Sequence, residues 1–508
     1  MSLDLALTIA RSGLASIQRN LAQTAQNIAN AETPGYTRKT IPQQAMVAGE
    51  TPLGLRNTDA QRAVDTAVLA QLDQSRGAVA AATVREALLQ GIEQAHGAAG
   101  DGATLGDAVP ALGDALTLLR AAPADAGQQH AVLVAATAVT TRLNDVSKAI
   151  GTARQAAQDG IVAEVASANA ALRDIAALTI QIKSDPAGGT AALEDQRDLA
   201  ISSLGESLEV KAIRKPNGDL LLIARGGVVL PLDPDRDVLS TAQATAGPAT
   251  YRGAGGSLPG VSLNGSDITG QVTGGRLGEY LALRDGLLPR YQAETDLVAA
   301  TLADRFARQG LVLFTDADGT SVPDPAQPYA GSAQIGLAGR LRVGQAVVGT
   351  PRLLRDGTQA VAASAGGPDA FTPNPPDGPA GFTGLLDRVL QFSLGAEAAA
   401  GTPWTPIATA GLGPDGSLAS PFAAPPAIAD YANSVTVAQL GDRADATGAK
   451  AGAASLQSAL EARFARGSGV DVDAEMAGMV TLQNAYAANA KVISTLQAMW
   501  DALFAAKP

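Results

Sequence analysis

The stretch that decides the fold reads LDLALTIARSGLASIQRNLAQTAQNIANAETPGY and covers residues 3–36. Two interleaved series run through it at heptad spacing: Leu7, Leu14, Leu21 and Ile28, and then Leu3, Ala10, Ile17, Thr24 and Ala31. Alternating steps of three and four residues are typical of one helix of a coiled coil. The helix is expected to end within a residue or two of Thr33, because Pro34 disfavours helical angles before it and Pro34-Gly35 favours a tight turn.

A helix with so narrow an apolar face needs a partner, because an isolated helix of this length is marginal in water. The partner is either the same segment of another molecule or another helix of this chain. A second series near the C-terminus also steps by four and three: Val472, Met476, Met479, Gln483, Tyr486, Ala490, Ile493, Gln497, Trp500 and Phe504. We therefore predict that the two ends pair as a coiled coil and that everything between them is a long insertion.

Both ends also carry recognisable motifs. Residues 27–38, NIANAETPGYTR, resemble the N-terminal signature of flagellar rod, hook and hook-associated proteins. Residues 483–495, QNAYAANAKVIST, resemble their C-terminal signature. The sequence departs from the family pattern at Glu32, where Asn is usual, and at Gln497 and Trp500, where an acidic residue and Leu are usual.

The middle of the chain is helical in character up to about residue 206. Helices are expected over 60–96, 104–120 and 125–182, the last with possible bends at two glycines, and a further helix follows from Leu193. The motif LEDQRD at 193–198 resembles the hook-associated protein 1 family, as do Arg62 and Asp65 before the first of these helices and TGGRLG at 273–278. Rod and hook proteins are mostly β beyond their first helix, so this helical block favours the hook-associated branch.

The pattern changes twice beyond this block. Apolar alternation from Glu209 around Asn217-Gly218-Asp219 predicts a β-hairpin, and helical spacing returns over 278–309. Proline clusters and frequent glycines over 311–427 predict a separate, mostly β outer domain. Helical character resumes over 428–465, and Gly467-Ser468-Gly469 forms a joint before the last helix.

The expected fold is mainly α with inserted β, in the discontinuous architecture of axial proteins. The predicted domains are a terminal coiled-coil domain of 1–36 and 470–508, a helical domain of 37–310 and 428–469 with a small β part at about 207–275, and the variable outer domain of 311–427.

Composition excludes several classes of function. The 508 residues carry a formal charge of −12, so nucleic acid and anionic membranes are poor partners. The chain has no cysteine, which excludes disulfides, thiolate catalysis and Cys-ligated metals. Neither a cleavable signal peptide nor a membrane-spanning run is expected, which on chemistry alone indicates a cytosolic protein. The resemblance instead implies export through the flagellar type III apparatus without a cleaved signal.

Nothing positive supports an enzyme. The two histidines, His96 and His130, are expected on the surface, and no zinc-protease, nucleophile-elbow or Walker motif occurs. Asp316-Ala317-Asp318-Gly319 is expected to be an ordinary turn, because the later ligand of a calcium loop is missing. Glu194 and Asp195 are adjacent on a helix and should point apart. No catalytic residue, cofactor or metal is predicted.

The resemblance implies a structural subunit of the hook–filament junction that assembles through its terminal helices, which are expected to be disordered before export. Its implied partners are copies of itself, hook protein below, hook-associated protein 3 above, and an export chaperone on the C-terminal helix. A hook or distal rod protein, and a cytosolic coiled-coil interaction protein, are the alternatives. The candidate assembly residues are Leu7, Leu14, Ile17, Leu21, Ile28, Pro34, Gly35, Tyr36, Met476, Met479, Tyr486, Asn489, Ile493, Trp500 and Phe504.

Overall fold

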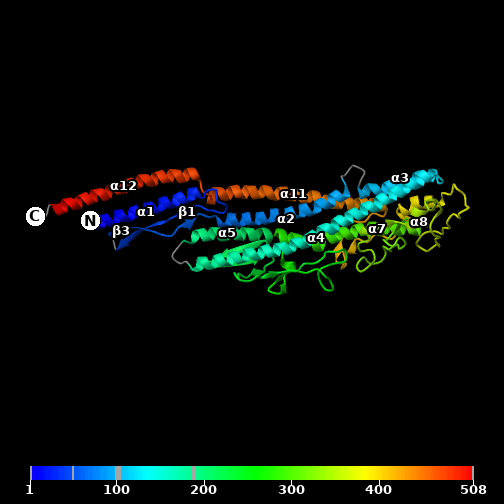
Figure 1. Cartoon of the computed structure of the whole chain (residues 1–508), viewed down its shortest axis with the longest axis horizontal. Coiled ribbons are helices and arrows are strands. Elements are labelled where there is room, and N and C mark those ends of the chain that lie inside the picture. Colours follow the sequence, from blue (N-terminus) through cyan, green and yellow to red (C-terminus); the bar gives the residue numbers. More distant parts are fainter. Residues whose placement is uncertain (1–2, 49–50, 98–103, 185–188, 506–508) are drawn as a thin grey trace.

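The protein is an elongated, mainly helical molecule whose long helices run along its length (Figure 1). The computed structural model describes residues 3–48, 51–97, 104–184 and 189–505. Among these residues, no helix combines the length and the apolar character needed to cross a membrane.

The two terminal helices lie side by side at one end and run antiparallel, so that both chain ends reach the same tip (Figure 1). α1 (Leu3–Ala29) and α12 (Val472–Ala505) form what we call the terminal pair. The prediction that the two ends pair as helices is confirmed. α1 ends four residues before Thr33, and the turn that follows contains Gly35 in the left-handed region at φ 78°.

A β-hairpin covers the other side of α1. β2 (Gln43–Ala48) and β3 (Thr51–Asn57) pair antiparallel, and β3 packs on α1 away from α12 (Figure 1). A shorter pair, β1 (Lys39–Thr40) with β4 (Gln61–Arg62), connects the terminal pair to the helical body. This hairpin was not predicted from the sequence.

The helical body begins at α2 (Thr66–His96), whose first N–H groups at Ala67 and Val68 donate to the Asp65 carboxylate. α2 packs against α11 (Ile428–Ser468), α4 (Ala126–Ser184) and α5 (Thr190–Ser207). α3 (Leu105–Ala121) starts with a capping box of Thr104 and Asp107 and lies along α4. α4 runs as one helix through both Gly151 and Gly160, and its 59 residues span about 90 Å.

The predicted hairpin is confirmed. β5 (Val210–Arg214) pairs with β6 (Leu220–Ala224) around Gly218, and β7 (Val229–Leu230) completes the sheet. β8 (Leu239–Ser240), β9 (Ser262–Leu263) and β10 (Ser266–Asp267) form a second, shorter sheet. The buried sides of these sheets share a core with α4, α5 and α6 (Gly275–Ala282). A π-helical turn at Leu283–Leu287 leads into α7 (Leu288–Arg308).

The expectation of a mostly β segment at 311–427 was wrong. Its strands are two or three residues long: β11 (Phe314–Thr315), β12 (Arg342–Val343), β13 (Glu397–Ala399), β14 (Thr402–Pro403), β15 (Ala410–Leu412) and β16 (Leu418–Ala419). Short helical turns alternate with them: Leu337–Gly339, α8 (Gln345–Gly349), α9 (Leu353–Asp356), α10 (Gly384–Arg388) and Val389–Ser393. Frequent proline and glycine prevent longer ladders, because proline lacks the N–H that a ladder needs.

This segment shares its core with the helices. Phe314, Leu341 and Leu412 belong to the same buried cluster as residues of α3, α4, α7 and α11. Asp296 on the buried helix α7 accepts hydrogen bonds from Gly336 N and Ala338 N at 2.7 and 2.8 Å. The segment is therefore packed onto the helical body, and the predicted domain boundaries stay a prediction.

One of the two histidines is not on the surface. His96 at the end of α2 is fully buried, and its Nε2 lies 2.8 Å from Gln439 Oε1 on α11. Burial lowers the pKa of His96, so the imidazole is neutral at pH 7. The surface prediction failed because α11, more than 300 residues away in sequence, covers this end of α2. His130 is exposed as predicted.

Candidate functional site

The contact between α1 and α12 is the first part of the candidate site. On α1, Ile17 is buried and Leu7, Leu14, Leu21 and Ile28 are half-buried. The side chain of Asn489 on α12 packs directly against Gly13 of α1, since a Cβ added at Gly13 would lie 3.3 Å from Asn489 Nδ2. The heptad positions predicted on α1 therefore do line its packed side.

On α12 the structure divides the predicted residues. Met479, Asn489, Ile493 and Trp500 are half-buried, whereas Met476, Tyr486 and Phe504 are exposed. Leu482 and Leu496 are half-buried where the predicted series had Gln483 and Gln497, which are exposed. The packed face of α12 is thus turned by one residue from the predicted face along part of its length.

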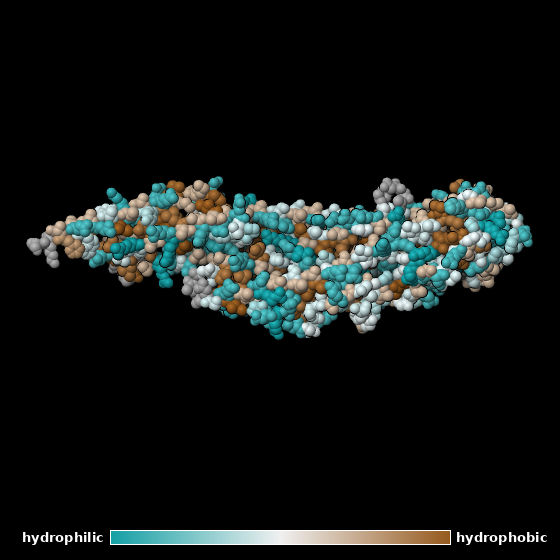
Figure 2. Space-filling view, in the orientation of Figure 1, coloured by the Kyte–Doolittle hydropathy of each residue, from teal (hydrophilic) through white to brown (hydrophobic). Residues whose placement is uncertain are grey.

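A large apolar surface of α12 is left uncovered. Between Met476 and Trp500 the helix carries one charged residue, Lys491. Its exposed large apolar side chains are Val472, Met476, Val480, Tyr486, Val492, Met499, Leu503 and Phe504. Figure 2 shows such residues gathered over this helix. Large apolar side chains of a helix normally face a packed core, but in the described part of the chain α1 packs along only one side of α12.

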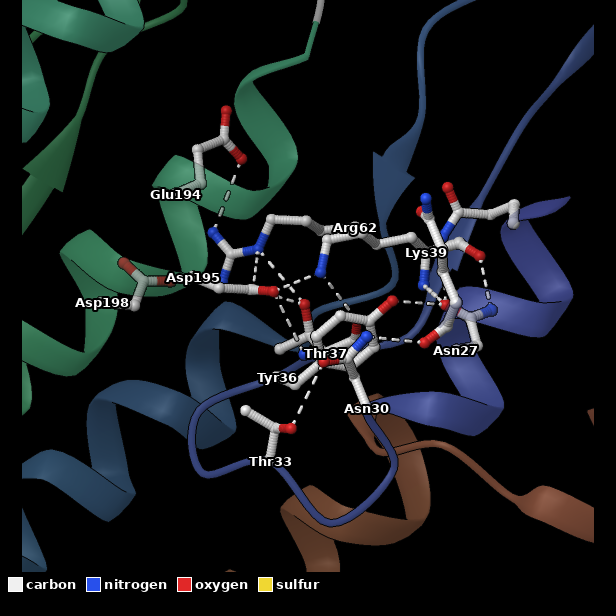
Figure 3. A network of polar contacts seen from close by, with 12 residues as sticks. Asn27, Asn30, Thr33, Tyr36, Thr37, Lys39, Arg62, Glu194, Asp195 and Asp198 are labelled. Atoms are coloured by element: carbon white, nitrogen blue, oxygen red, sulfur yellow. Dashed lines mark hydrogen bonds and ion pairs between the residues drawn. The ribbon is translucent and has the colours of Figure 1, made fainter. Parts of the chain in front are cut away.

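The second part of the candidate site is a polar network where the terminal pair meets the body, which we call the joint (Figure 3). Asn27, in the last turn of α1, is 1% exposed. Its Oδ1 accepts from Tyr36 Oη at 2.9 Å, and its Nδ2 donates to Lys39 O at 2.9 Å and to Glu475 Oε2 at 3.2 Å. Arg38 Nε reaches the other oxygen of Glu475 at 2.6 Å. One amide thus connects α1, the turn after it and the start of α12.

Carboxylates of α5 hold the other side of the joint. Asp195 accepts from Lys39 Nζ at 2.5 Å, from Thr37 Oγ1 at 2.6 Å and from Arg62 Nε at 2.7 Å (Figure 3). Asp198 accepts from Arg62 at 2.6 Å and from Arg214 at 2.5 Å. These side chains are mostly buried, and each charge in the cluster faces an opposite charge, as buried ions require.

The joint changes the acidity of two of its members. Burial lowers the pKa of Arg62, but the carboxylate of Asp198, followed by those of Asp195 and Glu194, outweighs it and leaves the pKa raised. Burial, followed by the negative charge of Asp195, raises the pKa of Tyr36, so its hydroxyl stays protonated and can donate to Asn27. The carboxylate of Glu194 lies 3.5 Å from the guanidinium of Arg62, which Asp195 also contacts. The adjacent residues Glu194 and Asp195 therefore meet around one cation, although they were expected to point apart.

The turn after α1 also lines a hollow of about 740 Å³ between α2, α5 and the end of α11. Pro34, Gly35 and Tyr36 lie at its edge, together with the exposed Leu199. A Cβ on Gly35 would stand 3.5 Å from that of Leu199, and the φ of 78° already favours glycine here. The predicted turn residues are therefore positioned by packing against α5.

Sequence reasoning did not name Lys39, Asp195, Asp198 or Glu475 as site residues. The available signal was the resemblance itself, because Arg62 and the LEDQRD run were singled out by family likeness. No group of three or more His, Cys, Asp or Glu residues in the described part of the chain is arranged to hold a metal ion. The Asp316–Gly319 segment is a turn, closed by Gly319 N donating to Asp316 O at 2.9 Å.

Comparisons with known families match three parts of the chain. Residues 7–37 match the model described as flagella basal body rod protein, and residues 461–505 match the flagellar basal body rod FlgEFG protein C-terminal model. Together with the paired terminal helices, these matches define a flagellar axial protein. Residues 90–319 match the helical domain of flagellar hook-associated protein FlgK. The chain belongs to the FlgK family of flagellar hook-associated proteins, which are structural components of the flagellum and not enzymes.

A search of solved structures found the flagellar hook junction protein FlgK from Burkholderia pseudomallei, at 23% identity and a TM-score of 0.40. The aligned region covers 50% of this chain and 45% of the Burkholderia chain, so this chain spans less than half of the length of that protein. A search of curated proteins gave no match.

Proposed function

We propose that this protein is a structural subunit of the junction between hook and filament, and that it assembles helically through its terminal helices after type III export. The observation that carries the proposal is α12, whose large apolar side chains remain exposed beside its contact with α1. Burying a large apolar side chain contributes roughly 1.5–3 kcal/mol, so neighbouring subunits that covered α12 would be held firmly.

In this proposal twelve of the fifteen candidate assembly residues have two roles, and the other three, Pro34, Gly35 and Tyr36, form the turn at the joint. Those facing the partner helix, such as Leu14 and Ile493, hold the terminal pair together, and those left exposed, such as Met476 and Phe504, contact neighbouring subunits. The terminal pair forms the inner domain, with residues 1–36 and 470–508, and the helical domain and 311–427 lie outside it. The terminal helices order on incorporation, which agrees with how little of α12 a single chain buries.

The proposed partners are copies of this chain, hook protein below and hook-associated protein 3 above. An export chaperone would cover the apolar side chains of α12 before export, because these side chains would otherwise face water. The protein would then be in the cytoplasm only transiently.

The test is a strain that lacks this protein, examined by electron microscopy together with its culture medium. We expect hooks without filaments and flagellin released into the medium. Absence of the hook itself would favour the alternative of a hook or distal rod protein, which the FlgK helical-domain match at 90–319 speaks against. Normal flagella would refute the proposal and favour a cytosolic interaction protein.

A further inference from the structure

The dipeptide Asn-Gly occurs twice in this chain, and both copies lie in β-hairpin turns. Asn217-Gly218 lies between β5 and β6, and Asn264-Gly265 lies between β9 and β10. In water, an asparagine followed by glycine loses its side-chain amide without an enzyme, because glycine has no side chain to shield its backbone nitrogen from the asparagine side chain. The two turns differ in whether the groups that react are held by hydrogen bonds.

In the turn between β5 and β6, both reacting groups are held. The Gly218 N–H donates to Lys215 O at 3.1 Å, and Asn217 Oδ1 accepts from Asp219 N at 3.2 Å. The strands on either side pair at five positions. For the Asn217 side chain to reach the nitrogen of Gly218, both hydrogen bonds must break at the end of this ladder.

In the turn between β9 and β10, neither reacting group is held. Asn264 and Gly265 are exposed and have φ of 48° and 86°, the two left-handed residues of a type I′ turn. Among the described residues, the Asn264 side chain and the Gly265 N–H have no hydrogen-bond partner. The strands on either side pair at only two positions. So short and exposed a pairing opens at low cost, and opening allows the rotation about the Asn264 backbone that ring closure requires.

We infer that Asn264 is a site of spontaneous deamidation and that Asn217 is protected from it. The backbone nitrogen of Gly265 attacks Cγ of Asn264, and the new N–Cγ bond closes a succinimide ring. The Cγ–Nδ2 bond breaks, and ammonia leaves with the proton of the Gly265 N–H. Water then adds to one of the two ring carbonyls and breaks its bond to the nitrogen. Position 264 becomes aspartyl when water attacks Cγ and isoaspartyl when it attacks the main-chain carbonyl carbon.

The modification adds a negative charge at an exposed turn while the rest of the sheet stays attached to the body. The next strand, β8, is fixed independently, because Leu239 N donates to Asn169 Oδ1 of α4 at 2.9 Å and Asn169 Nδ2 donates to Leu239 O at 2.8 Å. An isoaspartyl residue adds a methylene to the main chain, which shifts the register of β9 against β10 but leaves these two bonds in place. Because water does not restore the amide, the modified fraction of a sample increases with its age.

The test follows both turns in the purified full-length protein, incubated at pH 8 in water enriched in oxygen-18. Tryptic peptides 253–276 and 215–225 contain one Asn-Gly each, so mass spectrometry measures the two sites separately in one sample. Uptake of a heavy oxygen atom distinguishes the reaction from modification that preceded the incubation. In the folded protein, we expect the rate at Asn264 to exceed the rate at Asn217 at least tenfold. In guanidinium chloride the two rates should become similar, because only the neighbours in sequence then matter.

The matched variant is Asn264→Gln, whose longer side chain closes the corresponding ring much more slowly. It should abolish the uptake of heavy oxygen in peptide 253–276, and continued uptake there would place the reaction at another residue and overturn the inference. Equal rates at the two sites of the folded protein, or a faster rate at Asn217, would also overturn it. So would a folded protein that does not react at Asn264 while the unfolded protein reacts at both sites. The reaction needs no partner subunit, so none of these outcomes depends on the proposed function.

Discussion

Replacing Asp195 by Ala should open the joint while leaving the helical body folded. Asp195 is the acceptor for Lys39, Thr37 and Arg62, and Arg62 retains Asp198 when it is removed. Lys39, whose side chain is 6% exposed, keeps only the Thr37 carbonyl at 3.3 Å and the Tyr36 ring at 3.5 Å. Breaking a buried ion pair by removing one partner typically costs about 3–5 kcal/mol.

That cost should appear as local opening. The amide of Arg38 donates to Ser468 O at 2.9 Å and that of Ala63 to Arg38 O at 2.8 Å, so both report whether the joint is closed. A loss of about 3 kcal/mol raises the exchange rate of such protected amides by roughly a hundredfold. Hydrogen exchange with mass spectrometry of peptides covering 36–40 and 61–65 measures it.

The control is Asp174→Ala, which removes an exposed carboxylate from α4. It should leave exchange in both peptides at the wild-type rate. If Asp195→Ala exchanges no faster than Asp174→Ala, the buried charges do not hold the joint, and the argument from the polar network fails.

Three other predictions address the body, the insertion and the terminal pair. Burial raises the pKa of Asp73 to about 6 against the hydrogen bond from Ser202, so this carboxyl contributes stability that is present below about pH 4 and lost as pH rises through about 6. The free energy of unfolding of Asp73→Asn should therefore exceed that of wild type by about 1–2 kcal/mol at pH 7.5, and the two values should converge at pH 4.5. Urea unfolding at both pH values checks this, and a variant less stable than wild type at pH 7.5 would contradict it. Joining Gly310 to Ile428 by a short linker should abolish the soluble fold, because 311–427 covers the buried helix α7; a cooperative thermal transition in that variant would show the segment to be dispensable. Leu21→Glu on the packed side of α1 should prevent junction assembly, whereas Gln18→Glu on its exposed side should not, as scored by swimming and by flagellin in the medium; the reverse result would assign the packed face wrongly.

The parts of the fold that could be predicted are those set by local periodicity. The heptads of α1, the long helices of the body and the hairpin at Gly218 all follow from spacing within a single segment. α12 was placed correctly as a helix, but its packed face was not. The spacing of apolar residues identifies the packed face of a helix only when the other faces are polar. In α12 one heptad series passes through Gln483 and Gln497 and the neighbouring series passes through Leu482 and Leu496, and the structure packs the second.

What could not be predicted depends on contacts between distant segments. His96 looked like a surface residue because nothing near it in sequence shows that α11 covers it. Lys39 and Asp195 are separated by 156 positions, and no local rule pairs them. In 311–427 the composition was interpreted as a mostly β domain, which was wrong, and the core that this segment shares with α7 arises only in three dimensions.

The antiparallel course of the terminal pair has a consequence for the order of folding. Asn27 and Glu475 are separated by 448 positions, so α1 lacks its helical partner α12 until residues 472–505 have been synthesised. The folded body brings the two terminal helices close together, because Arg38, which follows α1, donates its N–H to the carbonyl of Ser468, which precedes α12. Once Arg38 and Ser468 are joined, only the segments from Asn27 to Arg38 and from Ser468 to Glu475 remain to be closed. Together they are roughly twentyfold shorter than the 448 positions between Asn27 and Glu475, which lowers the entropic cost of loop closure by about 3 kcal/mol. A folded body therefore brings the two ends close together, and a chain truncated before α12 would have a body but no terminal pair.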